Sequence, residues 1–87
     1  MITHVAIKFN GVIYSLPKPN RHHNVIIKII ELTNAQTVDA HGDDQGFLDD
    51  TGKYLNRKEA LEVARVNGQL RNDRPIWNNE LFSENLW

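Results

Sequence analysis

The residues that most constrain the fold are Asn10 and Gly11, which lie between two stretches of alternating apolar residues. Both positions tolerate a positive φ, and such a pair is the strongest short-range signal for a two-residue hairpin turn. A two-residue turn also fixes the strand register, so the prediction can be checked against the side chains. Over residues 3–9 and 12–16, the register places these large side chains opposite one another on one face: Phe9 with Val12, Ile7 with Tyr14, and Val5 with Leu16. The sequence therefore predicts an N-terminal β-hairpin.

The next apolar pattern has helical spacing. Residues 17–19 read Pro-Lys-Pro, which continues neither a ladder nor a helix, and Asn20 after them is a good N-cap. Apolar side chains then recur at intervals of three and four residues, while Lys28 and Glu31 face away from them. We predict a helix over residues 21–33. The many β-branched residues in this segment leave a buried strand as the alternative.

The second half of the chain repeats the order of a hairpin followed by a helix. Residues 46–48 and 53–55 flank an Asp-Asp-Thr-Gly turn composition, which indicates a second, shorter hairpin. Asn56 with Glu59 three residues later is an asparagine form of the capping box. We predict that the helix it opens has Gly68 as its C-cap.

Three segments have no regular periodicity. Residues 34–44 are polar and predict a loop, and residues 69–80 predict a surface loop anchored by Ile76 and Trp77. Residues 81–87 place two apolar pairs around a polar trio, so the chain end is predicted to pack on the core. The predicted fold class is α+β: N-terminal β-hairpin, helix, short second hairpin, helix and C-terminal apolar segment, packed on one small core.

Length and composition limit the classes of function. The 87 residues, about 40% of them apolar, suit a single domain over 1–87, to which a homodimer would add stability. The absence of cysteine excludes disulfides and thiolate chemistry and favours a reducing, cytoplasmic location. The sequence predicts neither a signal peptide nor a membrane span. A net charge of −1 argues against general nucleic-acid binding.

The densest group of reactive side chains is Arg21, His22 and His23, in the first turn of the predicted first helix. The free N–H groups and the positive dipole end of a helix favour an anion there, such as a phosphate. Cationic side chains are unfavourable at a bare helix N-terminus, so a run of them is better explained when an anion is bound. In the alternative interpretation, Arg21 pairs with an acid from residues 39–50, and the histidines pack above Ile26.

A second basic helix start occurs at Arg57 and Lys58. If the two predicted helices pack with their N-termini at the same end, Arg21 and Arg57 converge on one pocket, a geometry suited to phosphates. If they do not, the basic residues are solvated on separate faces of the molecule.

Two acidic segments have simpler explanations than catalysis or metal binding. Residues 50–52 match the Asp-Thr-Gly signature of aspartic proteases, but an aspartate precedes them and a lysine follows, where that motif needs an apolar and a small residue. A hairpin turn explains them. Residues 39–44 offer carboxylates and an imidazole to a hard divalent ion, yet their spacing fits no loop motif and is typical of a solubilising loop. The sequence predicts no metal site and no cofactor.

Three stretches of the chain form a recognisable pattern. They are Leu16-Pro17-x-Pro19-x-Arg21-His22-His23-x-Val25-Ile26, then Gln45-Gly46-Phe47-Leu48 through Gly52, Arg57, Glu59-Ala60 and Gly68-Gln69, and finally Leu81-Phe82-Ser83-Glu84-x-Leu86-Trp87. Through these stretches the chain resembles a family of small, functionally uncharacterised proteins encoded by tailed bacteriophages. The resemblance implies that the family pattern includes Arg21, His22, His23, Arg57, Gln69, Ser83, Glu84 and Trp87. It also implies a location in the host-cell cytoplasm, where small phage proteins often occlude a defence protein or sequester a nucleotide messenger.

These observations support three hypotheses for function. The first is a binding module with a role in counter-defence or host modulation, which holds a phosphate-bearing small molecule or nucleotide through Asn20, Arg21, His22, His23, Arg57 and Gln69. The second is an inhibitor of a host protein, such as a host-defence or CRISPR-type antagonist, that acts by surface mimicry through its acidic loop or through Ser83, Glu84 and Trp87. The third is a small hydrolase with His22 or His23 as general base or acid. No nucleophile or metal motif accompanies the histidines, so binding is favoured over catalysis.

Overall fold

The N-terminal hairpin forms in the predicted register. In the computed structural model, which describes residues 1–87, β1 (Ile2–Phe9) and β2 (Val12–Pro17) run antiparallel. The three predicted pairs are all observed: Phe9 with Val12, Ile7 with Tyr14, and Val5 with Leu16. Asn10 and Gly11 have φ values of 50° and 77°, the positive values that a two-residue turn of the mirror-image type requires.

The two hairpins join in one four-stranded antiparallel sheet with the order β2-β1-β3-β4. β3 (Gln45–Asp49) pairs with β1, and β4 (Tyr54–Asn56) pairs with β3. Because β1 is an inner strand, Val5 is fully buried, whereas Val12 at the end of the edge strand is 49% exposed. The six large side chains share one face of the hairpin, as predicted, and Val12, which lies beside the turn, is at the exposed end of that face.

The first helix forms, and the strand alternative is wrong. α1 (His22–Thr33) has Arg21 as its N-cap, not Asn20 as predicted. The side-chain amide of Asn20 instead donates to the Pro17 carbonyl at 2.8 Å and closes the preceding turn. The side chain of Asn24 accepts a hydrogen bond from the Arg21 N–H at 2.9 Å, which fixes the helix start one residue later.

The predicted capping box of the second helix is confirmed. α2 (Arg57–Val66) has Asn56 as its N-cap, and its side chain accepts from the second and third helical N–H groups. The Glu59 carboxylate accepts from the Asn56 N–H at 2.9 Å. The C-cap is Asn67, not Gly68 as predicted, and Gly68 follows it with a left-handed φ of 66°.

One contiguous cluster of buried apolar side chains lies between the sheet and the two helices. Phe47 of β3 is its largest member, and Leu81 from the C-terminal segment is fully buried within it. The chain end therefore packs on the core as predicted. The cluster consists of Ile2, Val5, Ile7, Val25, Ile29, Ala40, Phe47, Leu55, Ala60, Leu61, Ala64, Leu81 and Leu86.

The loops hold two short 3₁₀ helices, η1 (Gly42–Asp44) and η2 (Ser83–Asn85). Trp77 does not anchor its loop as predicted, because 66% of it is exposed. Two consecutive asparagines with positive φ follow it and turn the chain back, so that Trp77 forms an isolated β-bridge with Glu80. Ile76 alone is half-buried and packed against the core.

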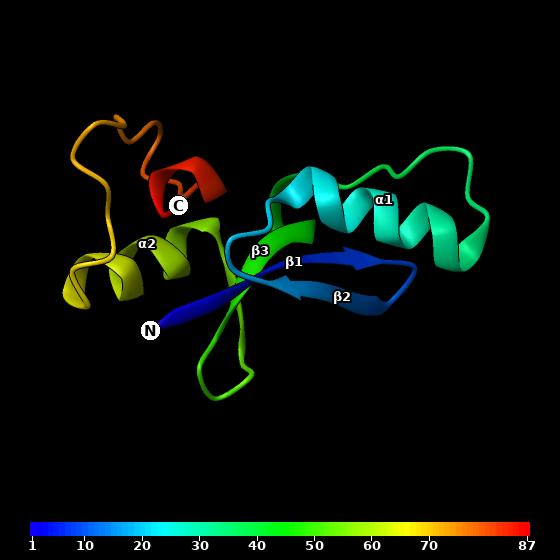
Figure 1. The fold of residues 1–87 in the computed structure, drawn as a ribbon, viewed down its shortest axis with the longest axis horizontal. Coiled ribbons are helices and arrows are strands. Elements are labelled where there is room, and N and C mark those ends of the chain that lie inside the picture. The colour runs from blue at the N-terminus through cyan, green and yellow to red at the C-terminus, as the bar shows by residue number, and fades with distance from the viewer.

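The two helices point away from each other, so that their N-terminal ends both face the middle of the molecule (Figure 1). η2 lies beside these two helix starts, at the red end of the chain (Figure 1). None of the helices is long and apolar enough to cross a membrane.

Candidate functional site

The starts of α1 and α2 and the short helix η2 line one pocket of about 300 Å³, which we call the helix-start pocket. Arg21 and Arg57 both line it, so the condition for a shared basic pocket is met. The first amides of an α-helix have no partner within the helix. At α2 the Asn56 side chain already accepts from two of them, whereas no side chain caps those at the start of α1. The lining residues are Arg21, His22, His23, Arg57, Phe82, Ser83 and Glu84.

Arg21 is fixed by the C-terminal segment. Its Nη2 donates to the backbone oxygen of Trp87 at 2.6 Å, and no acid from residues 39–50 pairs with it. The predicted alternative of an ion pair with that loop is therefore wrong. A guanidinium has five N–H donors, and this bond occupies one of them. The remaining donors are available to a ligand.

Arg57 is held in a comparable way. Its Nε donates to the Leu81 carbonyl at 3.1 Å, and its guanidinium carbon lies 4.4 Å from the ring centroid of Phe82. Burial lowers the pKa of Arg57, while the carboxylates of Glu80 and Glu84 act in the opposite direction. The side chain stays cationic, as arginine does throughout the pH range in which proteins are folded.

His22 is the imidazole that packs on the core, whereas His23 is exposed. Only 7% of His22 is accessible, and its ring stands edge-on to Phe47 with the centroids 5.0 Å apart. Its Nε2 lies 2.8 Å from the Gly46 carbonyl, and because a carbonyl only accepts, Nε2 carries the proton. The buried Nδ1 consequently presents a lone pair and has no hydrogen-bond partner.

The charge state of His22 follows from its burial. Desolvation lowers its pKa to about 4, the nearby Arg57 adds to this, and the Gly46 hydrogen bond and Glu84 oppose it. At neutral pH the ring is therefore uncharged, with its lone pair at Nδ1. An unpaired buried acceptor of this kind costs roughly 1–3 kcal/mol.

Three of the residues named from the sequence lie outside the pocket. The Gln69 amide bonds both the N–H and the carbonyl of Ile2, at 2.8 and 2.9 Å, and so ties the chain after α2 to β1. The Asn20 carbonyl accepts from Trp87 Nε1 at 2.7 Å. Asn20, Gln69 and Trp87 thus hold segments of the chain together. Phe82, which the sequence suggested only as a core residue, lines the pocket instead.

The pocket lacks the hydrogen bond that an activated nucleophile needs. Ser83 Oγ is buried and donates weakly to a Glu84 carboxylate oxygen at 3.5 Å, with no bond to His22. Nucleophilic catalysis by serine requires a base within hydrogen-bond distance of the hydroxyl. The geometry of the pocket therefore favours binding over hydrolysis.

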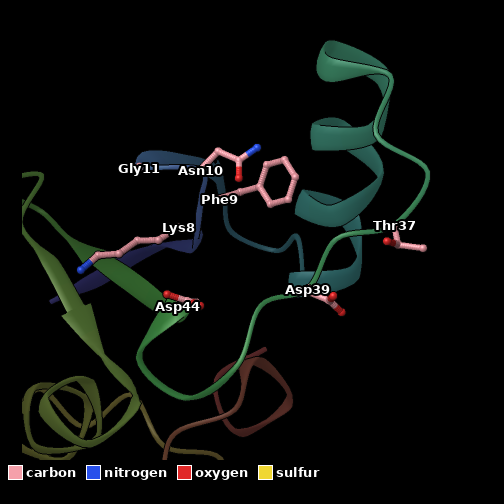
Figure 2. Close-up of a pocket in the computed structure, with 7 residues that line it drawn as sticks. All are labelled: Lys8, Phe9, Asn10, Gly11, Thr37, Asp39 and Asp44. Carbon is pink, nitrogen blue, oxygen red and sulfur yellow. The ribbon is translucent and has the colours of Figure 1, made fainter.

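A larger pocket of about 530 Å³ lies between the first hairpin turn and the loop before β3 (Figure 2). In Figure 2, Asp39 and Asp44 line it from the loop, Phe9 points toward α1, and Lys8 points away from Asp39. The Lys8 ammonium lies 4.3 Å from the Tyr54 ring centroid. No group of three or more histidine, aspartate or glutamate side chains is arranged to hold a metal ion. Two carboxylates repel a phosphate, so this pocket is the poorer anion site.

The comparisons with known proteins identify a family and no more. A family model described as the phage T4 y16D protein matches the chain over residues 1–87. This match confirms the resemblance to small, functionally uncharacterised phage proteins. No curated protein and no solved structure matches the chain.

Proposed function

This chain belongs to the phage T4 y16D protein family, and we propose that it is a binding module whose helix-start pocket holds a phosphate-bearing small molecule. The convergence of Arg21 and Arg57 at the starts of two helices carries the proposal. In the host cell, such a module would act in counter-defence or host modulation by sequestering its ligand.

The two arginines suit a phosphate because their guanidinium groups are already positioned. Each is bound through one N–H to a backbone oxygen, of Trp87 for Arg21 and of Leu81 for Arg57. The stacking of Arg57 on Phe82 restricts it further. Side chains that are ordered before binding lose less entropy on binding, and planar guanidinium groups match phosphate oxygens in pairs.

The remaining groups complement the arginines. The helix dipoles of α1 and α2 place partial positive charge at the pocket. Glu84 opposes an anion, so the pocket carries less positive charge than its arginines alone would give.

Calorimetric titration with inorganic phosphate tests the proposal. We expect Arg57→Gln to weaken binding by about tenfold or more, because hydrogen bonds to charged groups contribute roughly 1.5–3 kcal/mol. Arg65→Gln is the matched control, since Arg65 lies on the same helix and pairs with Glu62 on its exposed side. Thermal unfolding of each variant checks that the fold is retained. Equal phosphate affinity in the wild type, Arg21→Gln and Arg57→Gln proteins would contradict the proposal.

A host protein is the second candidate partner, which the chain would inhibit by surface mimicry. The observation that favours it is Trp77, an aromatic residue that is 66% exposed on a turn, because aromatic residues dominate the energetics of protein interfaces. Pull-down from host lysate with wild-type protein and Trp77→Ala tests this function. Capture of one stoichiometric protein that depends on Trp77 and is unaffected by Arg57→Gln would support it.

A further inference from the structure

We propose that the helix-start pocket and the pocket beside it together bind one ribonucleotide, with its phosphate at Arg21 and Arg57, its ribose at Glu84 and its base on Trp77. The inference rests on the proposed function, because the phosphate position is the same. It adds the chemical class of the ligand and a second subsite.

The second pocket, which we call the tryptophan pocket, shares a wall with the first. Its volume is also about 300 Å³, and Phe82 and Glu84 line both pockets. Arg57 lies over the Phe82 ring, so the wall that the two pockets share contacts an arginine of the proposed phosphate site. A ligand that fills one pocket and extends past this wall enters the other.

Trp77 provides a platform for a base. It lines the tryptophan pocket and is 66% exposed, so its indole surface is largely uncovered. Aromatic side chains bind nucleobases by stacking, which every base supports through its π-face. Because Trp77 is bridged to Glu80 across a tight turn, its backbone position is defined before a ligand arrives.

Glu84 lies between the cationic pocket and the aromatic one, as the ribose lies between the phosphate and the base of a nucleotide. A carboxylate is a poor neighbour for a phosphate but a good acceptor for the hydroxyl groups of a ribose, a role that acidic residues have in dinucleotide-binding folds. Glu84 also stabilises the charge of Arg57, and in this proposal its carboxylate has the second role of accepting from the sugar.

Hydrogen bonds hold the two pockets in a fixed relation. The side-chain Nδ2 of Asn85 donates to the Pro75 carbonyl at 3.1 Å, and the side-chain Oδ1 of Asn85 accepts from the Phe82 N–H at 2.9 Å. The Arg71 N–H donates to the Asn85 carbonyl at 2.8 Å.

The test is calorimetry with four probes: inorganic phosphate, ribose 5-phosphate, adenosine 5′-monophosphate and its 2′-deoxy analogue. We expect the wild type to bind the ribonucleotide roughly tenfold more tightly than ribose 5-phosphate because of stacking. Trp77→Ala should remove this difference and leave the affinity for ribose 5-phosphate unchanged. Trp77→Phe should retain most of it, and Val66→Ala, at an 82% exposed position on α2, should change nothing.

Glu84→Ala provides an independent test, because it should strengthen one interaction and weaken another. It should tighten the binding of inorganic phosphate, because a like charge is removed, and bring the ribonucleotide and its deoxy analogue to equal affinity. Tryptophan fluorescence should be quenched by the nucleotide in the wild type, and this quenching should be lost in Trp77→Phe, which retains Trp87.

The outcomes separate this inference from the proposed function. If phosphate and ribose 5-phosphate bind in a manner that depends on Arg57, but the nucleotide binds no more tightly than ribose 5-phosphate, the ribonucleotide inference is overturned and the anion site stands. If none of the four probes binds the wild type more tightly than Arg57→Gln, both are overturned. A nucleotide preference that Trp77→Ala leaves intact also overturns the base position.

Discussion

Residues 2–33 and residues 67–87 are held in place by different kinds of interaction. The first region consists of β1, β2 and α1, in which segments adjacent in the sequence pair with one another. The second region has only the three residues of η2 in a helix and is fixed by contacts with distant parts of the chain. The contacts that fix it include Leu81 N–H to the Arg57 carbonyl at 3.0 Å, Trp87 Nε1 to the Asn20 carbonyl at 2.7 Å and Arg21 Nη2 to the Trp87 backbone oxygen at 2.6 Å.

The difference shows that the candidate site depends on the less autonomous of the two regions. Phe82, Ser83 and Glu84 complete the helix-start pocket, and the segment that carries them is bonded to the starts of α1 and α2 through Arg21 and Arg57. Segments with few regular backbone bonds open at lower free energy than the sheet and helices they cover. A ligand that bridges the two regions would therefore stabilise the C-terminal segment more than the hairpin.

The largest expected effect concerns Leu81, the buried residue that connects the C-terminal segment to the core. We expect Leu81→Ala to lower the free energy of unfolding by about 2–5 kcal/mol, through lost burial and the cavity it leaves. Urea unfolding measures this. Leu32→Ala, at a 65% exposed position of α1, is the matched control and should change stability by less than about 0.5 kcal/mol. Equal effects of the two substitutions would mean that the segment is only loosely attached.

The second prediction concerns pH, because His22 connects α1 to β3. Its pKa is lowered from 6.5 to about 4 in the folded protein, so between these values the unfolded chain binds a proton that the folded protein does not. Stability is therefore fully present above pH 6.5 and falls as the pH drops toward 4, by about 3 kcal/mol from this group. His22→Gln should flatten this part of the pH profile of unfolding.

His23→Gln is the control for the pH experiment, because His23 is exposed on the same turn. Its profile should run parallel to that of the wild type between pH 4 and 7. A His22→Gln profile with the wild-type slope would show that the imidazole is not buried in solution.

The third prediction tests the first region, residues 2–33, at its hairpin turn. Gly11 has a φ of 77° with open space around it, so an added methyl group meets no neighbour and the cost is conformational. Gly11→Ala should lower the free energy of unfolding by roughly 1–2 kcal/mol, the cost of a left-handed backbone with a Cβ. Gly11→Asn should cost less, because asparagine adopts this conformation more readily. The free energies of unfolding of the two variants are measured and compared. Equal losses of stability in both would contradict the conformational explanation.

The smallest expected effect is the loss of one hydrogen bond. Trp87→Phe removes the Nε1–H that donates to the Asn20 carbonyl and should lower stability by about 0.5–1.5 kcal/mol. Trp77→Phe makes the same chemical change at an exposed position and should be nearly neutral. Thermal unfolding of both variants measures the difference, and a Trp87→Phe protein as stable as Trp77→Phe would show that this bond does not hold the C-terminal segment.

The parts of the fold that the sequence predicted are those governed by neighbouring residues. The hairpin register follows from Asn10 and Gly11, and the start of α2 follows from Asn56 and Glu59. The pairing of β3 with β1 joins residues far apart in the sequence, and no local signal distinguishes it from other strand orders. The N-cap prediction failed at Asn20 because the side chain closes the preceding turn, a choice between two local bonds that the residue type alone does not decide.

The candidate site was predictable in its chemistry and not in its assembly. Arg21, His22 and Arg57 could be recognised as basic helix starts, but their convergence depends on how the two helices pack. Trp77 was misplaced because a tryptophan beside an isoleucine resembles a buried pair. The two asparagines that follow Trp77 were the sequence signal that could have predicted the turn. Both have a positive φ, and the turn leaves Trp77 exposed.

The two edge strands of the sheet, β2 and β4, also affect how readily two molecules associate through their sheets. β4 has only three residues, and β2 ends in Pro17, which has no N–H to donate. The Lys28 ammonium donates to the Ser15 carbonyl on β2 at 3.0 Å, so one acceptor of that edge strand is already occupied. Short strands, proline and lysine are features that limit edge-to-edge strand addition. The sheet therefore offers little template for growth into larger β-aggregates.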